Sequence, residues 1–340
     1  MSRVHIIRVL SLIALSCLSV CARLAWSQSD PAAHLIEGAK NEKKLVLYTS
    51  VPLPETQLYV DAFQRKYPFV QAEIFRASGE PTLNRILTEA RAGRWEFDVV
   101  SITQMETLAQ QKVLSSYLSP EAKAYISDFK DPAGLWTSYA AIYYVLGYNT
   151  KLVSRNEAPK RWRDLLDPKW KGQFSMDREE YAWYATLLSS WGKEKTREYM
   201  EALAKQDIQW RKDHLLIAQL LAAGEFPLAI VYVHNVEDLK KKGAPVEWIG
   251  SLDPIVAALR RVALSAKPAH PSTAKLFIDF ILSKEGQEII RAQGRVPARS
   301  DVDSLSPKME QSKLKLKAVP HDLGLRYNEY IREFRQIFGL

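Results

Sequence analysis

The chain has 340 residues, of which 47% are hydrophobic and 25% are charged, with a formal net charge of +8. This composition excludes a disordered, fibrous or polytopic membrane protein, and the length predicts a soluble globular protein with two domains. Two cysteines in a chain of this length exclude a disulfide scaffold and a cysteine zinc cluster. The basic residues are scattered and lack interleaved aromatic residues, so no nucleic-acid partner is expected.

The N-terminal segment is typical of a secretory signal peptide. Arg3 and Arg8 precede an uncharged run over residues 9–22. Small residues occupy the positions that a signal peptidase recognises, and they predict cleavage after Ser27. The run is shorter than the ~20 residues that a transmembrane helix needs. A cleaved signal over residues 1–27 is therefore favoured over a retained anchor or a lipid anchor. Both cysteines lie in this run, so the mature chain is predicted to contain no thiol.

Short apolar runs alternate with helical patterns in the first part of the mature chain. In chain order the pattern predicts strands at residues 45–48, 72–75 and 97–102, with helices at residues 54–67 and 82–92 between them. Alternation of this kind is typical of a parallel sheet with crossover helices. The extended, aromatic-rich residues 139–148 are interpreted as the crossing between two domains.

A second α/β unit follows the crossing. The pattern predicts a short helix and turn at residues 162–170, a strand at 173–176, helices at 181–191 and 194–205, a helix that begins after Asp213, and a strand at 228–233. No flexible linker rich in Gly or Ser separates the two units. Two α/β domains joined by extended segments form a hinge, and we expect the binding site in the cleft between them.

The most specific pattern lies near the C-terminus. Residues 270–299 read HPSTAKLFIDFILSKEGQEIIRAQGRVPAR, which predicts two helices that meet at Ser283, with Ser283 as the cap of the second and Gly294 as its end. The pattern F-x-x-F-x-x-S-x-E-G-Q followed by G-x-x-P-x-R resembles the C-terminal signature of family 1 extracellular solute-binding proteins of bacterial ABC importers. Residues 45–50, 97–100 and 223–230 also resemble elements of that family. The resemblance covers residues 43–300 and is strongest to the ferric-ion-binding branch.

This resemblance implies an α/β chain with a two-lobed fold of the type 2 periplasmic-binding-protein kind. Each lobe is expected to hold a mixed, mostly parallel sheet flanked by helices, with a strand hinge between the lobes. The expected division places residues 28–142 and 255–303 in lobe 1, residues 143–254 in lobe 2, and residues 304–340 in a terminal helical segment that packs on a lobe. The implied function is capture of a small polar or ionic solute in the periplasm and its delivery to a membrane permease.

Candidate ligand-binding residues follow from the positions of the strand ends. In open α/β sheets ligands bind beyond the carboxyl ends of the strands, where backbone amides and helix N-termini converge. This rule selects Thr49, Ser50, Ser78, Gly79, Glu80, Ser101 and Thr103 in lobe 1, and Asp177, Arg178, Tyr232 and His234 in lobe 2. The alternative interpretation of each serine or threonine is an ordinary helix cap.

Iron(III), or an iron chelate, is one candidate solute. Ferric-binding relatives use a histidine, a carboxylate and two adjacent tyrosines, because Fe(III) prefers anionic oxygen donors. Here Tyr232 alone aligns with the tyrosine pair, Ser50 lies where the relatives have the histidine, and Glu80 corresponds to the carboxylate. Tyr232 and Glu80 are therefore the candidate metal ligands. The pair Tyr143-Tyr144 lies in the crossing segment and is interpreted as packing or hinge.

The sequence is also compatible with other functions. The alternative solute is an organic ion, such as a phosphonate, a polyamine, thiamine or a sugar phosphate, with Arg178 or Arg211 as a bidentate anion donor. An exported hydrolase is the less favoured alternative, because the chain lacks the nucleophile, metal-helix and phosphate-loop motifs that identify such enzymes. We expect a periplasmic monomer that is not an enzyme, has no cofactor, and delivers its solute to an ABC permease in the inner membrane or signals to a sensor.

Overall fold

The computed structural model describes residues 31–340 of the chain. The signal peptide predicted over residues 1–27 lies outside the described residues. Within residues 31–340 no helix has both the length and the apolar character needed to cross a membrane.

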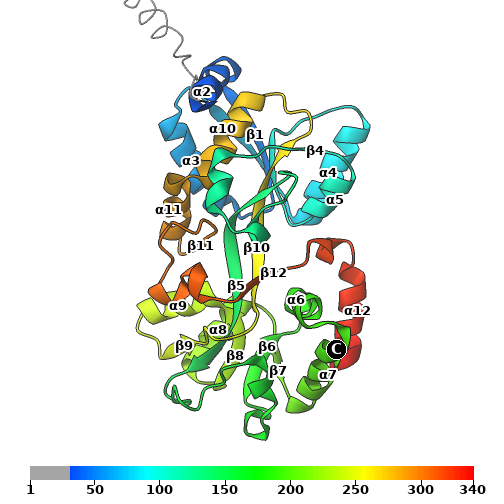
Figure 1. Cartoon of the computed structure of the whole chain (residues 1–340), viewed down its shortest axis with the longest axis vertical. Coiled ribbons are helices and arrows are strands. Elements are labelled where there is room, and N and C mark those ends of the chain that lie inside the picture. Colours follow the sequence, from blue (N-terminus) through cyan, green and yellow to red (C-terminus); the bar gives the residue numbers. More distant parts are fainter. Residues whose placement is uncertain (1–30) are drawn as a thin grey trace, which may run out of the picture.

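Two lobes lie one above the other and share two long strands (Figure 1). In lobe 1 the sheet order is β2-β1-β3-β10-β5, and in lobe 2 it continues from β5 as β8-β6-β7. The strands are β1 (Lys44–Thr49), β2 (Gln71–Arg76), β3 (Val99–Ser101), β4 (Leu114–Ser115), β5 (Thr137–Asn149), β6 (Phe174–Asp177), β7 (Gln209–Arg211), β8 (Leu228–Tyr232), β9 (Val246–Trp248), β10 (Ile255–Ser265), β11 (Val296–Pro297) and β12 (Leu316–Ala318).

Helices cover the sheets of both lobes. Lobe 1 carries α2 (Pro31–Glu42), α3 (Leu53–Lys66), α4 (Gly79–Arg91), α5 (Met105–Gln110), α10 (Pro271–Leu282) and α11 (Lys284–Ala292). Lobe 2 carries α6 (Tyr181–Trp191), α7 (Lys193–Leu203), α8 (His214–Ala223), α9 (Val233–Lys241) and α12 (Tyr327–Phe338). Short 3-10 helices include η2 (Ser127–Phe129), η3 (Trp162–Leu166), η4 (Pro168–Trp170) and η8 (His321–Gly324).

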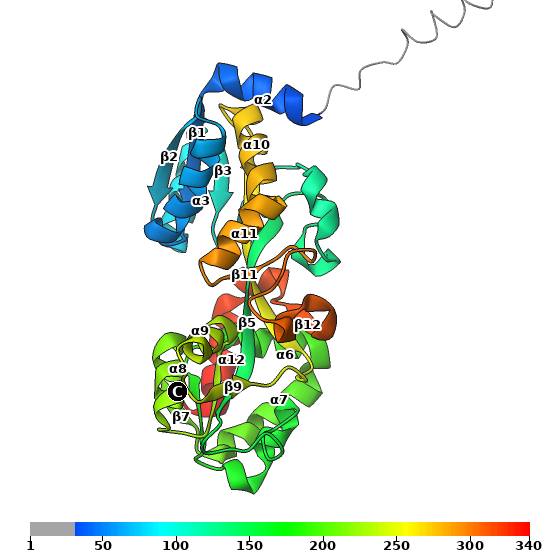
Figure 2. The ribbon, with the colours of Figure 1, turned by 90° about the vertical axis from the view of Figure 1, so that its left-hand side faces the viewer.

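The strands β5 and β10 form the connection between the lobes. They pair antiparallel from Val262 and Thr137 to Val256 and Tyr144, with a β-bulge between Arg260 and Arg261. Both strands run from one lobe into the other, and β5 is seen to cross between the lobes in the side view as well (Figure 2). The parallel pairs β1-β2, β1-β3, β6-β7 and β6-β8 lie outside this central pair. An extended two-strand connection is the strand hinge that the sequence predicts.

The C-terminal helix α12 packs on lobe 2. Its buried residues Tyr330 and Phe334 recur every four positions, as expected for one face of a helix. The Phe334 ring meets the Tyr181 ring edge to face at a centroid distance of 5.4 Å, and the Tyr184 hydroxyl donates to the Glu333 carboxylate at 2.9 Å. This segment therefore shares an aromatic cluster with α6.

Most predicted elements are present with small shifts at their ends. The strands predicted at residues 45–48 and 72–75 are β1 and β2, and the helix predicted at residues 181–191 is α6. Residues 162–170 form two 3-10 helices rather than one short helix. The strand predicted at residues 228–233 ends at Tyr232, because Val233 already begins α9. This difference places Tyr232 at the junction of a strand and a helix.

Candidate functional site in the cleft between the lobes

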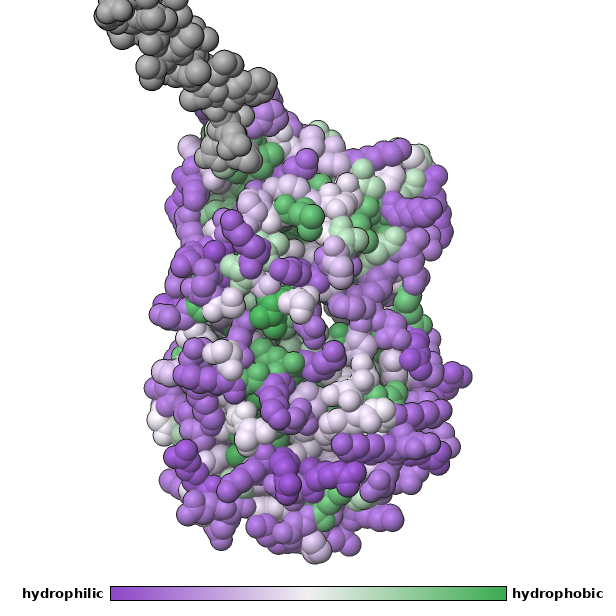
Figure 3. All heavy atoms as spheres, viewed as in Figure 1, coloured by the Kyte–Doolittle hydropathy of each residue, from purple (hydrophilic) through white to green (hydrophobic). Residues whose placement is uncertain are grey.

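The two lobes meet along one edge of β5. On this edge β11 of lobe 1 pairs with Ala140 and Ala141, and β8 of lobe 2 pairs with β5 from Tyr144 onward. A pocket of about 450 Å³ opens where these two strands face each other. The residues lining it come from both lobes: Asp213, His214, Leu215, Tyr232, His234, Asn235, Asp238, Gln293, Gly294 and Arg295. On the face shown in Figure 3, hydrophilic residues cover most of the surface of both lobes.

Three helices of lobe 2 begin beside this pocket. Glu180 precedes α6, His214 is the first residue of α8, and Tyr232 precedes α9. Each helix follows a neighbouring strand of the sheet, β6, β7 and β8 in turn, so their N-termini gather at one sheet edge. The partial positive charge of helix N-termini favours a negatively charged or oxygen-rich ligand at this edge.

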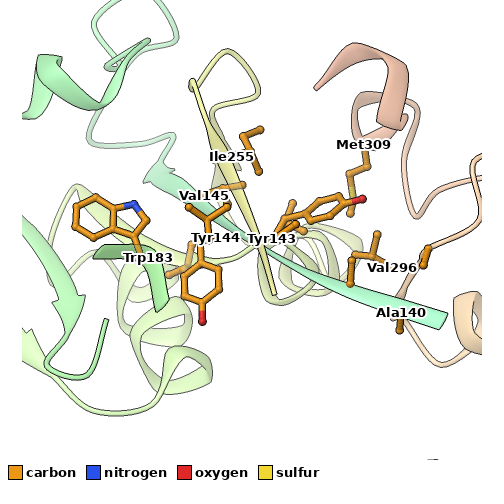
Figure 4. Close-up of a cluster of buried hydrophobic side chains, with 14 of the residues drawn as sticks. Ala140, Tyr143, Tyr144, Val145, Trp183, Ile255, Val296 and Met309 are labelled. Carbon is orange, nitrogen blue, oxygen red and sulfur yellow. The ribbon is translucent and has the colours of Figure 1, made fainter. Parts of the chain in front are cut away.

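Two phenols converge at the bottom of the cleft. Tyr144 on β5 and Tyr232 on β8 are directly opposite each other in the strand pairing, and their hydroxyl oxygens are 3.5 Å apart. Figure 4 shows Tyr143 and Tyr144 pointing in different directions from β5, with Tyr143 on the side of Met309 and Tyr144 on the side of Trp183. Burial raises the pKa of Tyr144 and of Tyr232 above their ordinary value, and the nearby Glu180 raises the pKa of Tyr232 further. Both phenols are therefore protonated in the empty site.

Two histidines flank Tyr232. The His214 ring stacks on the Tyr232 ring at a centroid distance of 3.7 Å, and the His234 ring lies at 5.7 Å from the same tyrosine. The pKa of each imidazole is lowered to about 4. Burial is the largest cause for both, and the charge of Arg295 contributes to the shift of His234. Both rings are therefore neutral near pH 7 and can accept a hydrogen bond or coordinate a cation.

Glu180 is a buried carboxyl group beside this cluster. It is 1% exposed, and neither carboxyl oxygen has a hydrogen-bond partner among residues 31–340. The atom His214 Nε2 lies 3.5 Å from one of these oxygens. Burial raises the pKa of Glu180 well above its ordinary value, with a further contribution from Asp177. An unpaired buried carboxyl costs free energy, and a water, an ion or a ligand can supply the missing partner.

Lobe 1 presents two arginines to the same region. Arg295, which lines the pocket, and Arg260 on β10 both contact the Glu55 carboxylate at the start of α3, Arg295 at 3.4 Å. Burial lowers the pKa of Arg260 to about 10, and the charge of Arg295 contributes to this shift. Two cations therefore share one carboxylate, and Arg295 is the one that lines the pocket, opposite Asp213 and Asp238 of lobe 2.

The lobe 1 residues predicted from the strand ends fall into two groups. Thr49 and Ser101 are buried, and their side chains bond within the lobe: the Thr49 hydroxyl donates to the Ser101 carbonyl at 3.2 Å, and the Ser101 hydroxyl lies 3.0 Å from the Tyr139 hydroxyl. The remaining residues are wholly or partly exposed at the starts of α3, α4 and α5, namely Ser50, Ser78, Gly79, Glu80 and Thr103. Within residues 31–340 no hydrogen bond or ion pair joins these five residues to lobe 2.

The lobe 2 residues predicted from the strand ends lie closer together. Tyr232 and His234 line the pocket. Asp177 is buried and accepts a hydrogen bond from the Asp213 amide at 2.7 Å, so it holds the loop before α8. Arg178 is exposed, and its amide donates to the Arg211 carbonyl at 3.1 Å. The structure therefore joins Tyr232 and His234 in one site and gives Asp177 a supporting position.

Four residues of the site were not among the predicted ligands: Tyr144, Glu180, His214 and Arg295. The sequence assigns Tyr144 to packing or to the hinge, because sequence order does not reveal which strand lies beside β5. Asp213 was recognised as a helix cap, and His214 follows it directly, so the strand-end rule applied to β7 would have found it. Glu180 lies three residues beyond the end of β6, so the strand-end rule could have found it as well, whereas no local signal distinguishes Arg295 from a surface residue.

A metal ion at this site would need the tyrosines. Among the described residues there is no group of three or more His, Cys, Asp and Glu that could hold a metal. The cluster of Tyr144, Tyr232, His214 and Glu180 supplies three oxygen donors and one nitrogen, a set that suits a hard trivalent cation.

Comparison with known proteins places the chain in a family. The model of the family described as bacterial extracellular solute-binding protein matches residues 98–319. An uncharacterised protein of Haemophilus influenzae is 26% identical over 300 residues, which cover 83% of this chain and 86% of that protein. An Fe(3+)-binding periplasmic protein of Serratia marcescens is 22% identical over 267 residues, which cover 75% of this chain and 78% of that protein.

Solved structures show the same fold. Iron-bound HitA from Pseudomonas aeruginosa superposes with a TM-score of 0.72 at 23% identity, covering 87% of this chain and 99% of that one. The periplasmic binding protein AfuA from Actinobacillus pleuropneumoniae, with fructose-6-phosphate bound, gives a TM-score of 0.67 at 25% identity, with the same coverage of 87% and 99%. The predicted two-lobed periplasmic-binding fold is thus confirmed. Because the family model covers more than half of the chain, the chain belongs to the bacterial extracellular solute-binding proteins.

Proposed function

We propose that this protein captures its solute between the two lobes in the periplasm and delivers it to an ABC permease of the inner membrane. Family membership and a pocket lined by both lobes support this role. Hinge motion of β5 and β10 brings lobe 1 residues onto a solute already held by lobe 2. In this proposal the protein acts as a monomer, performs no covalent chemistry and uses no cofactor of its own.

The proposed cargo is ferric ion, alone or with a small anion. The observation that carries this choice is the convergence of the Tyr144 and Tyr232 hydroxyls, 3.5 Å apart, beside the unpaired Glu180 carboxyl. His214, stacked on Tyr232, adds a neutral imidazole. Arginines 260 and 295 would neutralise an accompanying anion, and Glu80, exposed at the start of α4, would approach only when the cleft closes. The names of the Serratia and Pseudomonas relatives support iron as the cargo.

Ferric titration with tyrosine variants tests this cargo. A ferric ion bound by phenolates gives a visible charge-transfer band, so titration of the purified mature protein with ferric citrate is expected to produce one. The variants Tyr232→Phe and Tyr144→Phe are each expected to weaken the band and to lower ferric affinity by at least about tenfold, or about 1.4 kcal/mol. Tyr143→Phe is the matched control, because the Tyr143 hydroxyl is buried, unpaired and directed away from Tyr144.

The outcome decides the cargo clearly. A wild-type protein that shows no charge-transfer band with ferric citrate would contradict iron binding. Equal loss of the band in the Tyr143 control and the two site variants would contradict this assignment of the ligands.

An organic phosphate is the second candidate cargo. It is favoured by the two arginines that share Glu55 and by the helix N-termini and neutral imidazoles opposite them. A phosphate ester would place its anionic oxygens against Arg295 and its hydroxyls against His214 and His234. The AfuA structure, which holds fructose-6-phosphate, supports this class of solute.

Calorimetry separates the two candidates. Titration with fructose 6-phosphate is expected to release heat only if an organic phosphate is the cargo, and Arg295→Gln should then weaken binding by at least about tenfold. Arg291→Gln is the matched control, because Arg291 pairs with Glu288 on the exposed face of α11. If titration with fructose 6-phosphate releases heat and ferric citrate gives no charge-transfer band, then organic phosphate rather than iron is the cargo.

A further inference from the structure

The last 21 residues lie beyond the family match. The match ends at Val319, and the chain continues through η8 and α12 to Leu340. We call residues 320–340 the C-terminal strap. In Figure 1 the strap passes below α5 of lobe 1 before it descends along lobe 2 as α12.

The α12 end of the strap is fixed on lobe 2. Phe334 is fully buried, and its ring meets those of Tyr181, Tyr184 and Trp210 at centroid distances of 5.4, 6.0 and 6.2 Å. The hydrogen bond from Tyr184 to Glu333 adds a polar contact at 2.9 Å. A buried aromatic cluster of this kind does not open without local unfolding.

The other end of the strap touches lobe 1 through His321. The His321 ring lies 5.2 Å from the Trp136 ring, and His321 Nδ1 is 3.7 Å from a Glu106 carboxyl oxygen. Trp136 and Glu106 are also the partners of Arg261 on the hinge strand β10. The His321 side chain is 55% exposed, so its contact is much weaker than the anchor on lobe 2.

The strap runs close to both the hinge and the cleft. Just before it, β12 pairs with β10, and Lys317 lies 3.5 Å from Asp128 of lobe 1. At the start of α12, the Tyr327 ring meets the Tyr181 ring at 5.8 Å, beside the N-terminus of α6 where Glu180 lies. A segment anchored on one lobe and in contact with the other spans the gap that must widen when the lobes separate.

We propose that the C-terminal strap limits the opening of the cleft, with His321 as its releasable contact on lobe 1. The proposal rests on the opening and closing described under the proposed function, and it does not depend on the identity of the solute. Replacing His321 removes the contacts of the strap with Trp136 and Glu106, while the hinge contacts of Arg261 remain.

Distance measurements between the lobes test the strap in the absence of solute. Residues 28–340 contain no cysteine, so in a protein of those residues cysteines introduced at Asn84 on α4 and Glu194 on α7, both exposed, can be spin-labelled alone. Double electron–electron resonance then reports the distribution of lobe-to-lobe distances. We expect one narrow population in the labelled parent and a second, longer population in His321→Ala.

Two further variants identify the contact. His321→Phe retains a ring against Trp136 and is expected to restore the narrow population. His34→Ala, at an exposed position on α2, is expected to match the parent. If the longer population appears in both His321 variants, the strap still limits opening, and the Glu106 contact rather than the ring contact provides the restraint.

An unchanged distance distribution in His321→Ala would overturn the proposal that the strap limits the opening of the cleft. Circular dichroism of each variant verifies that the fold is retained. The longer distance population could appear in His321→Ala although the protein binds neither ferric ion nor fructose 6-phosphate. That result would support the role of the strap and overturn only the proposed function.

Discussion

His234 shows how the site links binding chemistry to stability. Burial holds its pKa at about 4 in the folded protein, against an ordinary value of 6.5. Between pH 6.5 and pH 4 the unfolded chain therefore binds more protons at this position than the folded protein does. Stability must fall as the pH is lowered through this window, and it is fully present above it.

Replacing His234 by glutamine isolates this effect. We expect the free energy of unfolding of the wild type to fall more between pH 7 and pH 5 than that of His234→Gln, by about 1–2 kcal/mol. Urea unfolding at the two pH values measures both quantities, and contributions from other groups such as Glu180 cancel in the comparison. His34→Gln, on the exposed face of α2, should keep the wild-type pH dependence. A variant that loses as much stability as the wild type would contradict a neutral, buried His234.

The site could be predicted only in part from individual residues. Tyr232 ends β8 and His234 lies two residues beyond it, positions that sequence order reveals. Tyr144 lies in the middle of β5, and its role depends on the register that places it opposite Tyr232. Strand register between segments 88 residues apart is set by tertiary packing, which no local pattern reports. Arg295 belongs to the other lobe, and its place in the pocket likewise depends on tertiary packing.

At the scale of elements, the signature S-x-E-G-Q has a structural explanation. The Ser283 hydroxyl accepts from the Gly286 amide at 3.2 Å and caps α11. The buried Gln287 donates to the Tyr139 and Ile281 carbonyls and accepts from the amides of Ala298 and Arg299. The signature therefore joins α10, α11 and the hinge strand β5. It identified the family correctly although it lies outside the ligand site.

Gly286 is the tightest point of this junction. A Cβ atom there would lie 2.2 Å from the Phe280 carbonyl oxygen and 2.8 Å from the Ile281 Cα, and both are backbone atoms that cannot move aside. We expect Gly286→Ala to reduce the free energy of unfolding by about 1–3 kcal/mol in a denaturant titration. Gly324→Ala is the matched control, because no atom lies within 4 Å of its added Cβ, and its stability should equal that of the wild type. Equal stability of the two variants would show that α11 can shift away from α10.

Helices and outer strands were the most predictable elements. Periodicity and caps placed α3, α6, α10 and the parallel strands β1 and β2 within a few residues of their ends. The strands β7, β9 and β12 have three residues each, which is too short for a periodic pattern. The 3-10 helices η3 and η4 contain the same apolar residues that a short helix would, so the pattern could not distinguish them.

At the scale of the whole molecule, the proposed function requires two lobes that close around one solute. The long strands β5 and β10 are the shared connection, and the pocket between β8 and β11 is lined by both lobes. The amino-acid pattern predicted the two-lobed architecture through family resemblance and the absence of a flexible linker. It could not predict how far apart the lobes lie, because that distance depends on contacts such as those of the C-terminal strap.

Small-angle X-ray scattering on the purified mature protein, with and without saturating ferric citrate, tests closure most directly. We expect the radius of gyration to fall when the solute binds, because lobe 1 moves onto the cluster around Tyr144 and Tyr232. The same titration with Tyr232→Phe, which is expected to bind weakly, should leave the radius unchanged at that concentration. A wild-type protein that binds ferric citrate, as shown by its charge-transfer band, and keeps its radius of gyration would contradict capture by closure.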